Sequence, residues 1–185
     1  LEGISLMRSY VLSFQRVEQL SDKLSAANQS LEITNRAVSR FVPFRFLDLL
    51  GKRSVRDIRR GDNVNLMMNV LFCDLRSFTT LIEGLGEDQA FPFINRYLRY
   101  MEPAIYANNG FINQYLGDCI MALFPGAPED AIRASLGMVR ELEVFNTDSD
   151  GPQLQFGIGI GTGRLMMGTI GGMDRLDSGV IGDTV

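Results

Sequence analysis

Two stretches decide the fold, Asn69-Val-Leu-Phe-Cys-Asp-Leu-Arg-Ser-Phe-Thr79 and Tyr115-Leu-Gly-Asp-Cys-Ile-Met-Ala-Leu-Phe124. Each carries an aspartate, Asp74 or Asp118, next to an apolar run that is typical of a buried strand. An isolated buried carboxylate is very costly, so such a side chain must be paired, hydrogen-bonded or bound to a metal. The two aspartates together predict a divalent-cation site that handles phosphates.

The sequence around these stretches predicts an α+β fold with a ferredoxin-like βαββαβ core, one antiparallel sheet with helices on one face. The domain is expected to span residues 66–185. Helices are predicted at residues 77–83, 88–107 and 129–145, and strands at residues 66–74, 111–115, 119–124 and 154–163, with residues 164–170 as the hairpin partner of the last strand.

Residues 1–41 are predicted to form a separate N-terminal element, a signalling helix. A connector at residues 42–65 is predicted to follow it. Heptad spacing from about Tyr10 to Phe41 predicts a coiled coil. The two apolar positions of the repeat are occupied by Val17, Leu24, Leu31 and Val38, and by Leu20, Ala27, Thr34 and Phe41. The alternative is an amphipathic helix that packs on its own domain.

Composition excludes several classes of function. The chain has 185 residues, a formal net charge of -4 and no histidine. The absence of histidine excludes histidine-based general bases, Ser-His triads and histidine-ligated zinc. The absence of a basic stripe argues against a nucleic-acid partner. No apolar run approaches the roughly 20 residues that span a bilayer, so no membrane contact is expected within the chain, and the reducing cytoplasm is the expected compartment.

Two further patterns concern the surroundings of the site. Cys73 and Cys119 each adjoin one of the aspartates. Neighbours on a strand point to opposite faces, so both thiols are expected behind the site as small buried residues, with a disulfide or redox role as the alternative. Glycines alternate from Gly157 to Gly163, which predicts a strand face without side chains that is approached closely by a helix, a partner subunit or a ligand.

Several stretches of the sequence, including those around Asp74 and Asp118, resemble a known family. This family is the catalytic domain of the class III nucleotidyl cyclases, which comprise adenylyl and guanylyl cyclases. The matching stretches follow one another as Phe41–Gly51, Val70–Thr79, Gly110–Phe124, Gly157–Gly172 and Val180–Val185. The resemblance implies attack of a nucleotide 3′-hydroxyl on the α-phosphate, release of pyrophosphate, and a site between two subunits of a homodimer. It also implies two divalent cations, Mg²⁺ or Mn²⁺.

By this resemblance Asp74 and Asp118 are metal ligands, assisted by the backbone carbonyl of Leu75. The backbone around Phe78 and Thr79 would cradle the phosphates, which suits the free N–H groups of a helix N-terminus.

Arg164 matches a position that contacts phosphate in some members of the family. The alternative is a solvated arginine in a hairpin.

Base selection departs from the family pattern. Adenylyl cyclases typically have Lys and Asp or Thr at the two base-selecting positions, and guanylyl cyclases have Glu and Cys, whereas this chain has Gln114 and Gly179. A glutamine amide offers both a donor and an acceptor, so Gln114 suits either purine. ATP is the expected substrate, because adenylyl cyclases dominate among bacterial members of this type.

The chain runs from Leu1 to Val185, which lies one residue before the family's ribose-orienting Asn and a few before its transition-state Arg. The 185-residue piece is therefore expected to be nearly inactive and the native protein to continue. The predicted function is that of an adenylate cyclase in signal transduction. The alternatives are a guanylate cyclase, or a degenerate cyclase-like domain that senses nucleotides or dimerises.

Overall fold

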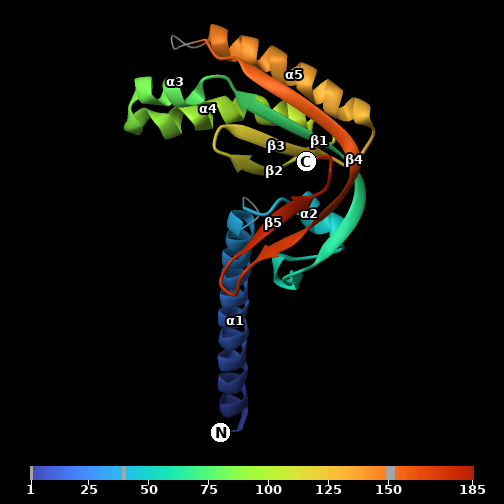
Figure 1. Cartoon of the computed structure of the whole chain (residues 1–185). Coiled ribbons are helices and arrows are strands. Elements are labelled where there is room, and N and C mark those ends of the chain that lie inside the picture. Colours follow the sequence, from blue (N-terminus) through green and yellow to red (C-terminus); the bar gives the residue numbers. More distant parts are fainter. Residues whose placement is uncertain (1, 39–40, 149–152) are drawn as a thin grey trace. The chain divides into compact units, whose positions relative to one another are not determined.

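The computed structural model describes residues 2–38, 41–148 and 153–185. The chain divides into two compact units, Leu1–Val42 and Pro43–Val185. Figure 1 shows the elements of both in the order of the sequence.

The first unit consists of helix α1, Glu2–Val38. The helix begins eight residues before the predicted start at Tyr10, and the predicted continuation through Ser39 and Arg40 lies outside the described residues. Its heptad side chains Val17, Leu20 and Leu24 are each more than half exposed. Within the described part of the chain, no helix has the length and apolarity needed to cross a membrane.

The second unit is a five-stranded antiparallel sheet with the strand order β2-β3-β1-β4-β5. This is the ferredoxin-like arrangement predicted from the sequence, with β5 added at the edge beside β4. Its strands are β1 (Asn63–Leu75), β2 (Phe111–Leu116), β3 (Cys119–Phe124), β4 (Phe156–Gly171) and β5 (Leu176–Ile181). Its helices are α2 (Phe44–Leu49), α3 (Phe78–Leu85), α4 (Glu87–Tyr106) and α5 (Pro128–Thr147), with a short 3₁₀ turn at Val55–Asp57.

Strand β4 corrects one prediction. The sequence predicted a strand that ends at Gly163 and a hairpin partner at residues 164–170, but the structure has one continuous strand up to Gly171. It continues because β1 begins at Asn63, earlier than predicted, and pairs with β4 without interruption from Asn63 opposite Gly168 to Leu75 opposite Phe156. The hairpin partner is β5, and Figure 1 shows the long curved course of β4 beside β1.

The main core lies between the sheet and helices α4 and α5. Alternate residues of β1, namely Leu71, Cys73 and Leu75, are buried there. Phe145 of α5 is fully buried and makes edge-on ring contacts with three aromatic residues of α4, Phe93, Tyr97 and Tyr100. This face of the sheet has the apolar periodicity that the sequence predicted.

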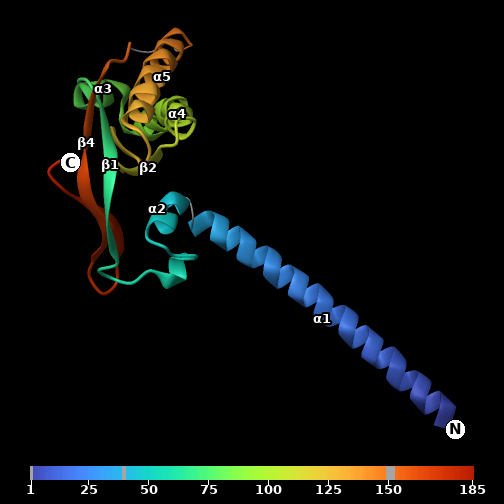
Figure 2. The same cartoon turned by 90° about the vertical axis from the view of Figure 1, so that its right-hand side faces the viewer.

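The other face of the sheet is covered over part of its length. Met68 and Val70, which alternate with the core residues of β1, are also buried, as are Phe46 and Leu47 of α2. Helix α2 lies within residues 42–65, the predicted connector, so this segment contributes buried side chains to the second unit. In Figure 2 the strands β1 and β4 are seen nearly edge-on.

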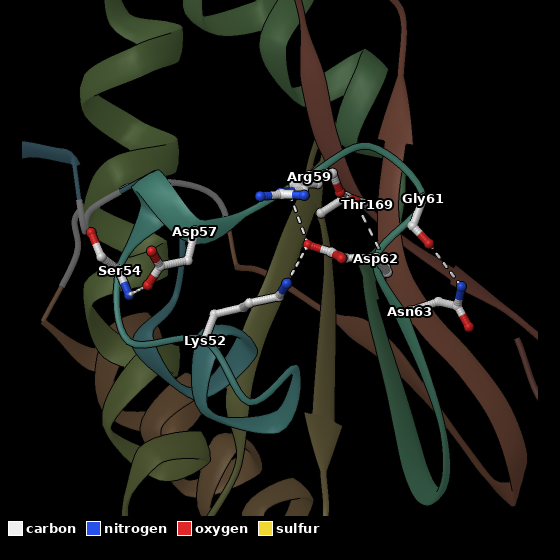
Figure 3. A network of polar contacts seen from close by, with 8 residues as sticks. All are labelled: Lys52, Ser54, Asp57, Arg59, Gly61, Asp62, Asn63 and Thr169. Atoms are coloured by element: carbon white, nitrogen blue, oxygen red, sulfur yellow. Dashed lines mark hydrogen bonds and ion pairs between the residues drawn. The ribbon is translucent and has the colours of Figure 1, made fainter.

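A polar network fastens the turn before β1 to the end of β4 (Figure 3). The Asp62 carboxylate forms an ion pair with Lys52 Nζ at 2.8 Å and accepts a hydrogen bond from Arg59 N at 2.7 Å. The hydrogen bond from Lys52 is the main cause that lowers the pKa of Asp62. Thr169 donates its hydroxyl to Arg59 O and its N–H to Asp62 O, while its carbonyl accepts from Gly61 N. These bonds hold the end of the ladder that lies far from Asp74.

Candidate metal and phosphate site

Asp74 is the second-last residue of β1 and lies opposite Gly157 of β4. Its neighbours Cys73 and Leu75 point into the helix-covered core, so Asp74 points to the other face of the sheet, where it is exposed. The carboxylate therefore avoids the cost of burial that its position in the sequence suggested. We call this uncovered surface around Asp74 and Gly157 the open face.

Asp118 reaches the same place from another hairpin. It lies in the turn between β2 and β3 after Gly117, whose φ of 68° is readily adopted by glycine. Its Oδ2 accepts a hydrogen bond from the backbone N–H of Leu75 at 3.2 Å. Strand pairing and this bond bring together the three residues predicted to hold metal, Asp74, Leu75 and Asp118.

The electrostatics of the two carboxylates fit a cation. Partial burial raises the pKa of Asp118, and the negative charge of Asp74 raises it further, while hydrogen bonds from backbone N–H groups act in the opposite direction. A divalent cation would remove this repulsion, and carboxylate and carbonyl oxygens are the ligands that Mg²⁺ and Mn²⁺ prefer.

The number of protein ligands also fits these ions. Within the described part of the chain, no group of three or more Asp, Glu, Cys or His side chains is placed to hold a metal. Mg²⁺ is commonly held by one or two carboxylates, with water and substrate phosphates completing its shell. The residues present therefore suit a metal that arrives with a phosphate ligand.

One prediction about the cysteines is confirmed and the other is wrong. Cys73 is fully buried in the core beside Tyr97, with Sγ and the hydroxyl oxygen 3.6 Å apart, and burial raises its pKa to about 12. Cys119 is only half-buried. Its neighbour Ile120 pairs with Cys73 and is buried in the core, so Cys119 lies on the open face with Asp74. The prediction failed because Asp118 belongs to a turn, where strand alternation does not apply.

The two residues predicted to cradle phosphates open helix α3. Phe78 is its first residue and Thr79 its second. The preceding residue, Ser77, has a φ of 56° and makes no side-chain capping hydrogen bond. The first turn of α3 therefore follows Asp74 closely, without a side-chain cap on its N–H groups.

Arg164 is not brought to the carboxylates within one chain. It pairs with Met67, seven positions along β1 from Asp74, which is up to about 23 Å in an extended strand. Its side chain is exposed. A role of Arg164 in phosphate binding stays a prediction.

The two base-selection residues lie on opposite edges of the sheet. Gln114 is on β2 and Gly179 on β5, with three strands between them. A Cβ atom on Gly179 would meet the side chain of Ile170, which is half exposed. The role of both residues in base selection stays a prediction.

Sequence reasoning did not single out the residue before Gln114. The ladder of β2 and β3 is irregular between Ile112 and Gln114, and Asn113 lies within this irregularity. The Asn113 side chain is buried, and its Oδ1 has no hydrogen-bond partner among the described residues. Only pairing with β3 reveals this feature.

The alternating glycines are explained mainly by contacts within the chain. Cβ atoms on Gly161 and Gly163 would collide with Thr184, and one on Gly157 would lie 2.6 Å from a guanidinium nitrogen of Arg76. Nothing lies within 4 Å of a Cβ built on Gly159. Arg76 was not among the predicted site residues, and its place on this face follows from its contact with Gly157, which pairs with Asp74.

Comparison with known proteins places this geometry in a family. No protein-family model matches the chain. An adenylate cyclase of Anabaena cylindrica is 37% identical over 177 residues, which is 91% of this chain and 35% of that protein. A terminal-differentiation-specific adenylate cyclase of Dictyostelium discoideum is 30% identical over 154 residues, which is 80% of this chain and 7% of that protein. The chain thus spans about a third or less of these relatives.

Solved structures share the fold as well. A bacterial light-regulated adenylyl cyclase superposes with a TM-score of 0.75 at 25% identity, over 88% of this chain and 49% of the other. A guanylyl cyclase superposes with a TM-score of 0.58 at 32% identity, over 68% of both chains. An adenylyl cyclase from P. aeruginosa gives 0.56 at 27% identity, over 66% of this chain and 68% of the other. By sequence and by fold, this chain belongs to the class III nucleotidyl cyclases and carries their catalytic domain.

Proposed function

We propose that the protein is an adenylate cyclase, which converts ATP to 3′,5′-cyclic AMP and pyrophosphate in signal transduction in the cytoplasm. The observation that carries the proposal is the convergence of Asp74, Leu75 and Asp118, held by the hydrogen bond from Leu75 N to Asp118 Oδ2. The relatives named adenylate cyclase support the choice of reaction.

The roles of the chain's own residues follow from their chemistry. Asp74 and Asp118 would hold two divalent cations together with the Leu75 carbonyl. Bound cations polarise a phosphoryl group and lower the pKa of an attacking hydroxyl. The uncapped first turn of α3, at Phe78 and Thr79, would bind phosphate oxygens through backbone N–H groups.

The proposed assembly is a homodimer with the substrate between two subunits. Helix α1 carries an exposed heptad stripe, which suits a parallel coiled coil that sets the geometry of the two catalytic domains. In one chain Gln114 and Gly179 are on opposite sheet edges and Arg164 lies far along β4 from Asp74. A second subunit is the natural source of the groups that complete the site.

A guanylate cyclase is the second candidate. Gln114 presents both a donor and an acceptor to a purine, and the 32% identical structure is that of a guanylyl cyclase. A degenerate regulatory domain is disfavoured by the presence of both aspartates.

The test is turnover by the full-length protein with ATP and GTP, each in Mg²⁺ and in Mn²⁺, with Asp74→Ala as the control. Cyclic AMP that disappears in the variant supports the proposal. Cyclic GMP as the main product would show that the substrate is GTP, with the same mechanism. The absence of any cyclic product from a protein that dimerises favours the regulatory domain.

A further inference from the structure

The guanidinium of Arg76 lies beside Gly157 on the open face. Arg76 extends the β1–β4 ladder by one bond, since its N–H donates to Gln155 O at 2.8 Å. A Cβ atom on Gly157 would lie 2.6 Å from one terminal nitrogen of Arg76, 3.1 Å from Cζ and 3.3 Å from Nε. The flat group therefore lies against the glycine backbone, in space that any other residue at position 157 would fill.

This position is directly beside the carboxylates. Gly157 is the residue that pairs with Asp74, so the guanidinium covers the strand position opposite that carboxylate. Among residues 2–38, 41–148 and 153–185, the ion pairs within 4.0 Å are Lys52–Asp62, Arg133–Asp130 and Arg175–Asp177. Arg76 thus lies next to the strand position of Asp74 and forms none of these ion pairs.

Charge and shape indicate what such an arginine would bind. A guanidinium presents a planar fork of N–H donors that fits phosphate oxygens, often through two parallel hydrogen bonds. The adjacent carboxylates suit cations, whereas Arg76 suits the anionic oxygens of the same ligand.

We propose that Arg76 binds the triphosphate of the nucleotide directly, and that Gly157 is glycine because its bare backbone provides the surface on which the guanidinium lies. The inference rests on the proposed function for the identity of the ligand. It adds a substrate-binding residue outside the predicted set.

The first test measures binding rather than turnover. 3′-Deoxy-ATP lacks the attacking hydroxyl, so its affinity can be measured by calorimetry with Mg²⁺ present. Hydrogen bonds between charged groups predict that Arg76→Ala weakens 3′-deoxy-ATP binding by about tenfold or more. Binding of 3′-deoxyadenosine, which has no phosphate, should change by less than about twofold. Arg76→Lys should recover part of the affinity, because it keeps the charge but loses the fork.

The second test is a double-mutant cycle on the contact itself. Gly157→Ala should weaken 3′-deoxy-ATP binding when Arg76 is present and have little further effect in Arg76→Ala protein. Gly159→Ala is the matched control, because it adds the same methyl group to the same strand where nothing lies within 4 Å. Circular dichroism of each variant verifies folding.

Three results with the variants overturn the inference. They are unchanged 3′-deoxy-ATP affinity in Arg76→Ala, an equal loss for 3′-deoxyadenosine, and an effect of Gly157→Ala that persists without Arg76. Wild-type protein that does not bind 3′-deoxy-ATP overturns it as well. The proposed function fails separately, if wild-type protein forms no cyclic nucleotide while the phosphate-dependent effect of Arg76→Ala is still observed.

Discussion

Near the end of β1, the two faces of the sheet differ sharply over a few residues. Cys73 and Leu75 face helices α4 and α5 in a closed apolar core, whereas Asp74 and Arg76 face outward beside Gly157. The helix-covered face gains its stability from buried apolar area. The open face gathers charged side chains that form no ion pair among the described residues, so they contribute little to stability and are available for binding. Substitutions on the two faces should therefore have separable effects on stability and on activity.

The largest effect is expected on the open face. Asp74→Ala should lower cyclase activity by about a thousandfold, because metal ions contribute several kcal/mol to such reactions. Thermal unfolding should change little, because Asp74 is exposed. The matched control is Asp88→Ala, an exposed aspartate in α4, which should keep full activity. A strongly destabilised Asp74→Ala would show that the two faces are not separable.

The second effect belongs to the helix-covered face. Phe145→Ala should lower the free energy of unfolding by about 3–5 kcal/mol, because it leaves a cavity among three aromatic rings. Phe91→Ala removes the same group from a side chain that is 78% exposed and should cost less than about 0.5 kcal/mol. Denaturant unfolding measures both, and similar losses in the two variants would contradict the assignment of the core.

The reactivities of the two cysteines allow a direct comparison of the two faces of the sheet. A thiol reagent should modify half-buried Cys119 at least about tenfold faster than buried Cys73, whose pKa is raised to about 12 by burial. Mass spectrometry of the folded protein identifies the modified residue, and Cys119→Ser should remove the fast phase. Faster modification of Cys73 than of Cys119 would contradict the assignment of Cys119 to the open face.

The smallest effect concerns the Asp118 carboxylate, which is partly buried and lies near the negative charge of Asp74. The pKa of Asp118 is raised above its ordinary 3.8, so the metal-free folded chain binds this proton more tightly than the unfolded chain. Stability from this residue should therefore fall as pH rises from about 4 through the raised pKa. Asp118→Asn should be more stable than wild type at neutral pH, by less than about 1 kcal/mol, and equal to it below about pH 4. Thermal unfolding in EDTA over this range measures the difference, and a variant that is less stable throughout would contradict it.

Prediction from sequence succeeded where a local pattern of residues is compatible with only one kind of secondary structure. The ferredoxin-like topology and the strand Cys119–Phe124 followed from apolar periodicity and turn residues. It failed at β4, because Gly163 and Arg164 resemble a turn, yet pairing with β1 keeps the chain extended there. It also failed for Cys119, because the face of a residue beside a turn depends on its partner strand.

The sequence by itself determined the class of fold, the two carboxylates and the resemblance to class III cyclases, because these depend on residue types at short spacings. Only the tertiary structure decided that Asp118 bonds to Leu75 N, that Thr184 and Arg76 cover three of the alternating glycines, and that Gln114 and Gly179 lie on opposite edges. The physical reason is that strand pairing and chain packing bring together residues that are far apart in the sequence, and no local pattern encodes which atoms then meet.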